Sequence, residues 1–252
     1  MLLEEKSAVI YGAAGSIGGA VARAFAAEGA TVHLAGRTLD ALEKVAQEIR
    51  SEGGAAEVAQ VDALDEHAVD EHAAAVAAEA GGIDISMNVI SHPWKHGTPL
   101  AEMALEDFTA EVMAAVSTTF LTARAAARHM IPRGSGVILM FGGTGPPLRD
   151  YYIGGTQVAL GAIDLMRRQL AAELGPHGIR VVTLRSGGVP ESIPEETEGR
   201  EGIIERTIAS QTMLGRAATY EDVGNVAAFV ASDRARSMTG ATANISCGAL
   251  VD

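Results

Sequence analysis

Short apolar runs alternate with longer segments of helical periodicity along the whole chain of 252 residues. The short runs are rich in β-branched residues and have the length of strands, whereas the longer segments repeat apolar residues every three or four positions. This pattern predicts seven strands, at residues 7–10, 31–35, 57–61, 83–88, 136–141, 179–185 and 241–246. Strands separated regularly by helices favour an α/β protein with a doubly wound parallel sheet in a single domain, residues 1–252.

The predicted helices lie between these strands, at residues 20–28, 39–49, 65–80, 105–130, 156–174 and 220–232. Thr38 is a candidate cap for the second helix, which carries Leu39, Leu42, Val45 and Ile49 on one face. Prolines and a glycine make 91–99 a loop. Residues 186–212 begin with prolines, glycines and glutamates and show little apolar periodicity before Ile203, so we expect a mobile lid there.

A glycine-rich turn, Tyr11 to Gly19, joins the first strand to the first helix. A strand that enters such a turn and opens a helix presents unpaired N–H groups and the positive end of the helix dipole to an anion. Gly12 permits the tight turn, Gly15 permits close approach of a phosphate, and Gly18 permits close packing of helix on strand. The turn therefore predicts a Rossmann-type dinucleotide site that includes Ser16 and Ile17.

Composition excludes several other classes of function. The formal net charge is −13 and the basic residues are not clustered, which argues against nucleic acid or an anionic membrane as a partner. Cys247 is the only cysteine, so an internal disulfide and a cysteine metal cage are excluded. The acidic N-terminus does not resemble a signal peptide, and no apolar run reaches membrane-spanning length. We therefore expect a cytoplasmic protein that acts on a small molecule.

The chain resembles the short-chain dehydrogenase/reductase family over nearly its whole length. Features in the family's order are the glycine turn, Arg37, Asp62, Asn88, residues 178–181 before Gly187, residues 214–216 and residues 239–240. One departure is that the family's usual middle glycine falls on Ser16, whereas the middle glycine here is Gly15. The resemblance implies a nicotinamide cofactor held by Gly12, Gly15, Ser16, Ile17, Gly18, Asp62, Ala63, Asn88 and Gly187. It also implies a homotetramer or homodimer, and the alanine-rich stretches 123–127 and 159–162 would permit close helix packing between subunits or on the sheet.

The end of the second strand carries the signal for cofactor preference. An acidic residue there would bind ribose hydroxyls, but the chain has Gly36 followed by Arg37. Because a guanidinium matches a phosphate in shape and charge, Arg37 favours NADP(H) over NAD(H). The alternative is an arginine that is simply solvated at a helix start. Asp62, beside Ala63, resembles the family's adenine contact, or it is a turn residue.

The family's four catalytic side chains are missing from the corresponding positions. When residues 161–163 and 170–174 set the register, the family's asparagine, serine, tyrosine and lysine fall on Ala115, Gly143, Thr156 and Leu160. An aliphatic hydroxyl by itself is not acidic near neutral pH, and leucine has neither a charge nor a donor. Loss of general acid catalysis costs about 10²- to 10⁴-fold in rate. The usual ketone-reduction mechanism therefore does not transfer to this chain.

Three residues are candidate proton donors. Tyr152 lies one helical turn before Thr156 if the helix extends that far, close to the displaced tyrosine of enoyl thioester reductases in the family. Thr144 follows the position of the lost serine. His92 lies in a loop with Trp94 and His96, where either histidine is a candidate acid and the indole an apolar wall. Each has a structural alternative, as a packing residue, a turn residue or a solvated histidine.

Other charged or metal-binding groups are weaker candidates. His92 and His96 have the spacing of a metal pair, but no third ligand is evident, so no metal site is predicted. Arg149 and Asp150 either bind a carboxylate or pair with each other at the surface. Arg185, at the end of an apolar strand, must be paired or functional.

Three functions agree with these observations. The first is an NADP(H)-dependent reductase that acts on a polarised C=C, C=N or C=O bond with an unusual proton donor. The second is a non-redox isomerase, cyclase or lyase on the same fold. The third is a nucleotide-binding protein without turnover. The first is favoured because the nucleotide features persist where the catalytic residues do not.

Overall fold

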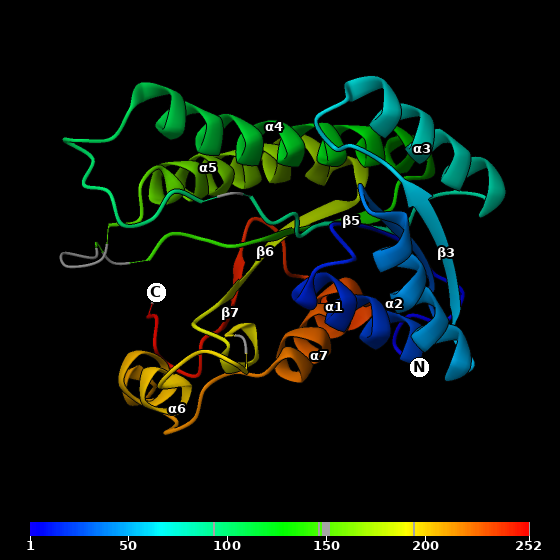
Figure 1. The fold of residues 1–252 in the computed structure, drawn as a ribbon. Helices are drawn as coiled ribbons and strands as arrows, with labels where there is room; N and C mark the ends of the chain where they lie inside the picture. Colours follow the sequence, from blue (N-terminus) through cyan, green and yellow to red (C-terminus); the bar gives the residue numbers. More distant parts are fainter. Residues whose placement is uncertain (93, 146, 148–151, 194, 252) are drawn as a thin grey trace.

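The chain forms one seven-stranded parallel sheet with helices on both faces (Figure 1). A computed structural model describes residues 1–92, 94–145, 147, 152–193 and 195–251, apart from the side chain of Thr207. The strand order is β3-β2-β1-β4-β5-β6-β7, and every neighbouring pair is parallel. The order reverses between β1 and β4, which is where open α/β sheets bind ligands. The predicted doubly wound α/β fold is confirmed.

The strands are β1 (Ser7–Tyr11), β2 (Thr31–Gly36), β3 (Ala55–Gln60), β4 (Ile85–Asn88), β5 (Gly136–Phe141), β6 (Ile179–Ser186) and β7 (Thr242–Ile245). The α-helices are α1 (Ser16–Ala27), α2 (Leu39–Ser51), α3 (Glu66–Glu79), α4 (Leu105–Met130), α5 (Thr156–Leu174), α6 (Arg200–Ile203) and α7 (Tyr220–Ala231). The bounds of α4, β5 and α5 match the sequence prediction, and the other predicted strands and helices differ from it only at their ends.

Two hydrophobic clusters form the core, one on each face of the sheet. Even-numbered residues of β1 and β2, such as Ile10 and Leu34, pack with α1, α2 and α7, and odd-numbered residues, such as Val9, face the other cluster with α3, α4 and α5. This division follows from the alternation of side chains along a strand. Each strand therefore has two buried sides, which explains its nearly continuous apolar sequence.

Two helix starts differ from the expectations. Helix α1 begins at Ser16 rather than at residue 20, because the glycine turn itself supplies the first helical turn. Thr38 occupies the cap position of α2, but its side chain makes no capping hydrogen bond. Leu39 is exposed, so the buried face of α2 consists of Leu42, Val45 and Ile49 together with Ala46.

Helix α5 begins at Thr156, and the suggestion that it extends back to Tyr152 is wrong. Gly154 has a φ of +56° and Gly155 is the cap residue. A left-handed residue at this point interrupts the helical backbone between Tyr152 and Thr156. The side chain of Tyr152 is therefore not placed by a helical turn relative to Thr156.

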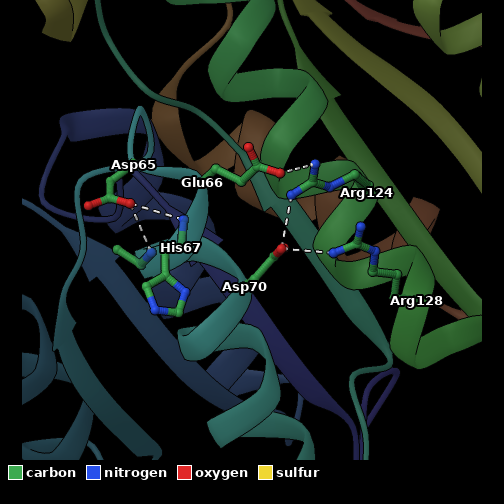
Figure 2. Close-up of polar contacts among 7 residues, drawn as sticks. Asp65, Glu66, His67, Asp70, Arg124 and Arg128 are labelled. Carbon is green, nitrogen blue, oxygen red and sulfur yellow. Dashed lines mark hydrogen bonds and ion pairs between the residues drawn. The ribbon is translucent and has the colours of Figure 1, made fainter.

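A network of ion pairs fixes α3 against α4 (Figure 2). The guanidinium of Arg124 contacts Glu66 at 2.6 Å and Asp70 at 3.0 Å, and Arg128 contacts Asp70 at 2.8 Å. Asp65 caps α3 by accepting hydrogen bonds from the N–H groups of His67 and Ala68. The network holds the C-terminal part of α4 in place, and other residues of α4 form a wall of the cavity described below.

Residues 186–212 lead from the end of β6 into short helical turns that include α6 and continue through residues 204–211. The expectation that this segment is a lid stays a prediction. Within the residues that the structure describes, no helix is both long enough and apolar enough to cross a membrane.

Candidate functional site

The turn after β1 is shaped so that only glycine fits at two positions. Gly12 has a φ of +87°, and a Cβ there would lie 2.8 Å from the carbonyl oxygen of Val89. A Cβ on Gly18 would lie 2.3 Å from the carbonyl oxygen of Gly12. Both distances are shorter than any tolerable contact, and the atoms involved are backbone. The glycines therefore bring the start of α1 close against the ends of β1 and β4.

The N-terminus of α1 is open to an anion. Gly15 is the cap residue, no side chain caps the helix, and its first turn carries no acidic residue. Gly15 and Ser16 are exposed, and Ile17 is half-buried. Free N–H groups and the helix dipole favour a phosphate at this position. The cradle that a Cβ would fill and the uncapped helix together fit the pyrophosphate of a dinucleotide.

Two other predicted cofactor residues lie at the ends of β2 and β3. Arg37 is exposed and follows β2 directly. Asp62 is also exposed, and its carboxylate accepts a hydrogen bond from the N–H of Leu64 at 3.0 Å, whereas Ala63 is buried. Asp62 therefore stabilises the turn after β3, and its contact with adenine stays a prediction.

Asn88 closes β4 and uses both ends of its amide. Its Nδ2 donates to the hydroxyl of Thr122 on α4 at 3.1 Å, and its Oδ1 accepts from the N–H of Ile90 at 3.1 Å. Asn88 therefore fixes the turn after β4 against α4. Gly187 follows β6, where a Cβ would lie 3.3 Å from the Cβ of Ser246.

A cavity of about 280 Å³ lies beyond the carboxyl ends of β4 and β5, beside the first turn of α1. Helix α5 contributes Thr156, Leu160 and Ile163, which share one face at helical spacing, and α4 contributes Ala115 and Thr119. The other lining residues are Ile17, Asn88, Val89, Ile90, Ser91, His92, Trp94, Phe141 and Gly142. The lining is mainly apolar, so the cavity favours an apolar group.

Three of the four positions that the sequence register predicts to match the family's catalytic residues meet in this cavity. Ala115, Thr156 and Leu160 all line it. At the exit of β5, a Cβ on Gly142 would lie 2.6 Å from the Cδ2 of Leu160, so the missing side chain leaves room for the leucine. A Cβ on the neighbouring Gly143, the fourth position, would lie 2.8 Å from the Cδ of Arg185.

The structure separates the three candidate donors. His92 lines the cavity and meets Trp94 edge-to-face, with 5.4 Å between the ring centroids. Burial, and then the charge of Arg37, lower the pKa of His92 and favour its neutral form. The hydroxyl of Thr144 donates to Asp164 at 3.3 Å, and the Tyr152 side chain is 46% exposed. Neither Thr144 nor Tyr152 is among the described residues that line the cavity.

Sequence reasoning missed Glu111 and did not connect His96 with Thr156. Glu111 is only 1% exposed, and its carboxylate accepts hydrogen bonds from the N–H groups of Lys95 and Gly155. The Nε2 of His96 lies 3.2 Å from the hydroxyl of Thr156. The available signal was a carboxylate one helical turn before Ala115, on the face of α4 that turns inward.

The remaining charged candidates have mixed outcomes. Arg185 donates to the carbonyl oxygen of Thr144 at 3.2 Å and is therefore paired, as a charge at that position requires. Arg149 and Asp150 lie outside the described residues, as does Tyr151. Among the residues that are described, no group of three or more histidine, cysteine or acidic side chains is arranged to hold a metal ion.

Known proteins resemble this chain over most of its length. A family model described as enoyl-(acyl carrier protein) reductase matches residues 12–249. D-threitol dehydrogenase of Mycolicibacterium smegmatis is 30% identical over 241 residues, which are 95% of this chain and 90% of that protein. Gluconate 5-dehydrogenase of Gluconobacter oxydans is 29% identical over 225 residues, covering 89% and 87% of the two chains.

Comparison of the whole fold with solved structures identifies the same family. The crystal structure of a short-chain type dehydrogenase/reductase from Mycobacterium marinum superposes with a TM-score of 0.86 at 30% identity, covering 98% of this chain and 96% of that one. Members of this family use nicotinamide cofactors, in agreement with the cradle at the start of α1. The chain therefore belongs to the short-chain dehydrogenase/reductase family and is an oxidoreductase of that family.

Proposed function

We propose that this protein is an NADP(H)-dependent reductase that acts on a polarised C=C bond, or on a related C=N or C=O bond, with a non-standard proton donor. One observation carries the proposal. A glycine cradle that fits a dinucleotide adjoins an apolar cavity whose α5 wall presents Thr156 and Leu160, which the sequence register matches to the family's tyrosine and lysine. Transfer of hydride to carbon requires a bound nicotinamide cofactor, which the cradle would hold. The usual protonation of a carbonyl oxygen requires the family's tyrosine and lysine, which this chain lacks in the predicted register.

The glycine turn, with Ser16 and Ile17, would hold the pyrophosphate and nicotinamide side of the cofactor, and Arg37 would hold the 2′-phosphate. Asp62, Ala63, Asn88 and Gly187 complete the proposed cofactor site. Reduced nicotinamide supplies a hydride when it is bound. Arg37 supports the phosphate-bearing form because its guanidinium is exposed at the end of β2, where a carboxylate would select the unphosphorylated ribose.

The cavity lining supports an apolar acceptor such as an enone. Val89, Ile90 and Phe141 offer no hydrogen bonds to a polyhydroxylated substrate. The description of the matching family model, enoyl-(acyl carrier protein) reductase, names a C=C reduction. Among the donors named from the sequence, His92 lies in the cavity wall, and Tyr152 and Thr144 would have to move to reach it.

We also propose that the protein is a cytoplasmic homotetramer or homodimer that associates through α4 and α5. Large apolar side chains on these helices are exposed in the single chain, including Met113, Phe120, Val158 and Leu165. Exposed apolar surface of this kind favours contact with a second subunit.

The cofactor proposal is tested by titrating the protein with NADPH and NADH. Trp94 is the only tryptophan and lies in the cavity wall, so its fluorescence reports occupancy. We expect NADPH to bind at least about tenfold more tightly than NADH, since a paired 2′-phosphate contributes on the order of 1.4 kcal/mol or more. Arg37→Asp should reverse the preference, and Arg50→Asp, a remote arginine on α2, should not. Equal binding of both nucleotides by the wild type contradicts the assignment.

The reaction proposal is tested by single-turnover oxidation of bound NADPH with an enone, a ketone and an imine of similar size. We expect the enone to be reduced fastest. Failure of NADPH to bind below millimolar concentration overturns the reductase and favours a non-redox enzyme, and binding without oxidation by any acceptor favours a nucleotide-binding protein. A Tyr152→Phe or Thr144→Val variant with full turnover removes that residue as the donor.

A further inference from the structure

A hydrogen-bonded pair connects the cavity with the protein surface. Thr156 lines the cavity at the first turn of α5, and its hydroxyl oxygen lies 3.2 Å from the Nε2 of His96. His96 is exposed and is not among the described residues of the cavity wall. The threonine hydroxyl thus has a ligand site on one side and an imidazole in contact with solvent on the other.

One buried carboxylate holds both members of this pair. Glu111 accepts from the N–H of Lys95, the residue before His96, and from the N–H of Gly155, the residue before Thr156, the latter at 2.9 Å. A carboxylate that is 99% removed from solvent stays in place only if such donors satisfy it. Removing it would take this acceptor from both N–H groups, and that of Gly155 lies in a buried place. Glu111 therefore ties the loop of His96 to the start of α5 through α4.

We propose that His96 and Thr156 form the proton relay of this site, with Glu111 as the positioning residue; the inference rests on the proposed reductase function. Thr156 donates its hydroxyl proton to the substrate atom that becomes negative when the neighbouring carbon receives hydride from the bound cofactor. His96, as the imidazolium, gives its Nε2 proton to the threonine oxygen in the same step and is then reprotonated by solvent. One hydride and one proton are added to the substrate.

The relay answers the objection that an aliphatic hydroxyl is too weak an acid. Thr156 by itself has no useful acidity, but here it gives up one proton as it gains another, so the acidity is that of the imidazolium. Among the residues that the structure describes, the charged groups on the surrounding elements include Lys95, which pairs with Asp107 at 3.5 Å, and Glu111. Within residues 152–163, Tyr152 is the only titratable residue.

The kinetic test measures single-turnover hydride transfer to the best acceptor as a function of pH. We expect His96→Ala and Thr156→Val each to lower the rate about 10²-fold, and the double variant to be no slower than either, because the two act as one unit. The wild-type rate should fall as the pH rises, because the relay needs the imidazolium form, and His96→Ala should lose that fall. Thr156→Ser should retain most of the rate, and His67→Ala, an exposed histidine of α3, should be unchanged.

The positioning role of Glu111 is tested by the rate and the pH dependence of a Glu111→Gln variant. Glu111→Gln keeps the shape of the side chain but leaves one of the two N–H groups facing an amide NH₂, so we expect an intermediate loss of rate with the wild-type pH dependence kept. NADPH binding, followed by Trp94 fluorescence, should be unchanged in His96→Ala and Thr156→Val. A loss of binding in either variant overturns the relay, because the residue would then serve the cofactor.

Nuclear magnetic resonance tests the pair without turnover. In ¹⁵N-histidine-labelled protein, Thr156→Val should shift the Nε2 resonance of His96, and Thr144→Val, which alters a hydroxyl outside the cavity, should not. An unshifted resonance overturns the relay and leaves the reductase untouched. So does a pH profile that is flattened by His92→Ala rather than by His96→Ala. Absence of any turnover by the wild type overturns the proposed function and the relay with it.

Discussion

The two faces of the sheet are built differently although they share the same seven strands. The face under α1, α2 and α7 is packed by apolar side chains, with two helices brought together at Gly224, where a Cβ would lie 2.9 Å from the Cβ of Ala24. The face under α3, α4 and α5 also buries polar groups, among them His33, Asn88, Glu111 and Thr122. Because side chains alternate along a strand, one sequence serves both faces independently.

The two faces of the sheet therefore serve different purposes, one in packing the fold and the other in forming the candidate site. The apolar face positions α1, whose uncapped N-terminus follows the glycine turn, and it needs tight packing rather than reactive groups. The polar face carries the cavity wall, the Glu111 bridge and the His96–Thr156 contact. Buried polar groups are costly unless they are hydrogen-bonded, so their concentration on one face indicates where the protein uses them. Substitutions on the two faces should therefore change the free energy of unfolding, and its dependence on pH, in different ways.

The largest effect is expected at Gly224, where α7 crosses α1. Gly224→Leu has no room, since the nearest atoms are the Cβ of Ala24 and the carbonyl oxygen of Ala20 at 3.2 Å. We expect a loss of about 3 kcal/mol in the free energy of unfolding, measured by urea denaturation, that does not vary between pH 5 and 8. Gly175→Leu, where a Cβ would meet open space, is the control and should cost far less. Equal losses would show that the crossing is not tight.

A smaller effect, dependent on pH, is expected on the polar face at His72. Its Nδ1 lies 3.2 Å from the Tyr11 hydroxyl, and burial, and then the charge of His33, lower its pKa to about 4. An unfolded histidine titrates near 6.5, so between about pH 6.5 and pH 4 the unfolded chain binds more protons than the folded one. Stability should therefore fall as the pH falls through that window, by about 2 kcal/mol once partial exposure is allowed for.

The measurement for His72 is urea denaturation at several pH values, comparing His72→Gln with the wild type. The variant should lose part of the acid sensitivity. His67→Gln, an exposed histidine on the same helix, should keep it. If both variants keep the wild-type dependence of stability on pH, half-buried His72 is not the source of that dependence.

The smallest effect is expected in the ion-pair network of α3 and α4 (Figure 2). Arg124 contacts two carboxylates and lies over the ring of Phe120 at 5.6 Å, so Arg124→Ala should cost about 1 kcal/mol. Arg23→Ala, which removes the exposed pair with Glu48, should cost less than about 0.5 kcal/mol. The difference should shrink in 1 M NaCl. A larger cost for Arg23 would mean that the network adds nothing beyond isolated surface pairs.

The sequence by itself determined the fold and the glycine turn at the start of α1. Runs of buried strand residues, helical periodicity and the Gly12–Gly18 spacing are local signals, so the bounds of α4, β5 and α5 and the place of the cradle could be read without coordinates. Local signals also placed Thr38 at a helix start but not its missing hydrogen bond, because a cap depends on the rotamer of the side chain.

Only the tertiary structure decided which candidate residues meet. Tyr152 and Thr156 are four residues apart, yet Gly154 ends the helical path between them, whereas His96 and Thr156 are 60 residues apart and lie in contact. Likewise, Glu111 joins Lys95 to Gly155 across three segments of the chain. Contacts of this kind depend on how α4, α5 and the loop after β4 pack together, and no periodicity in one segment encodes the position of another. The sequence therefore identified candidate residue types, but which of them are in contact depends on how the helices and loops pack in the tertiary structure.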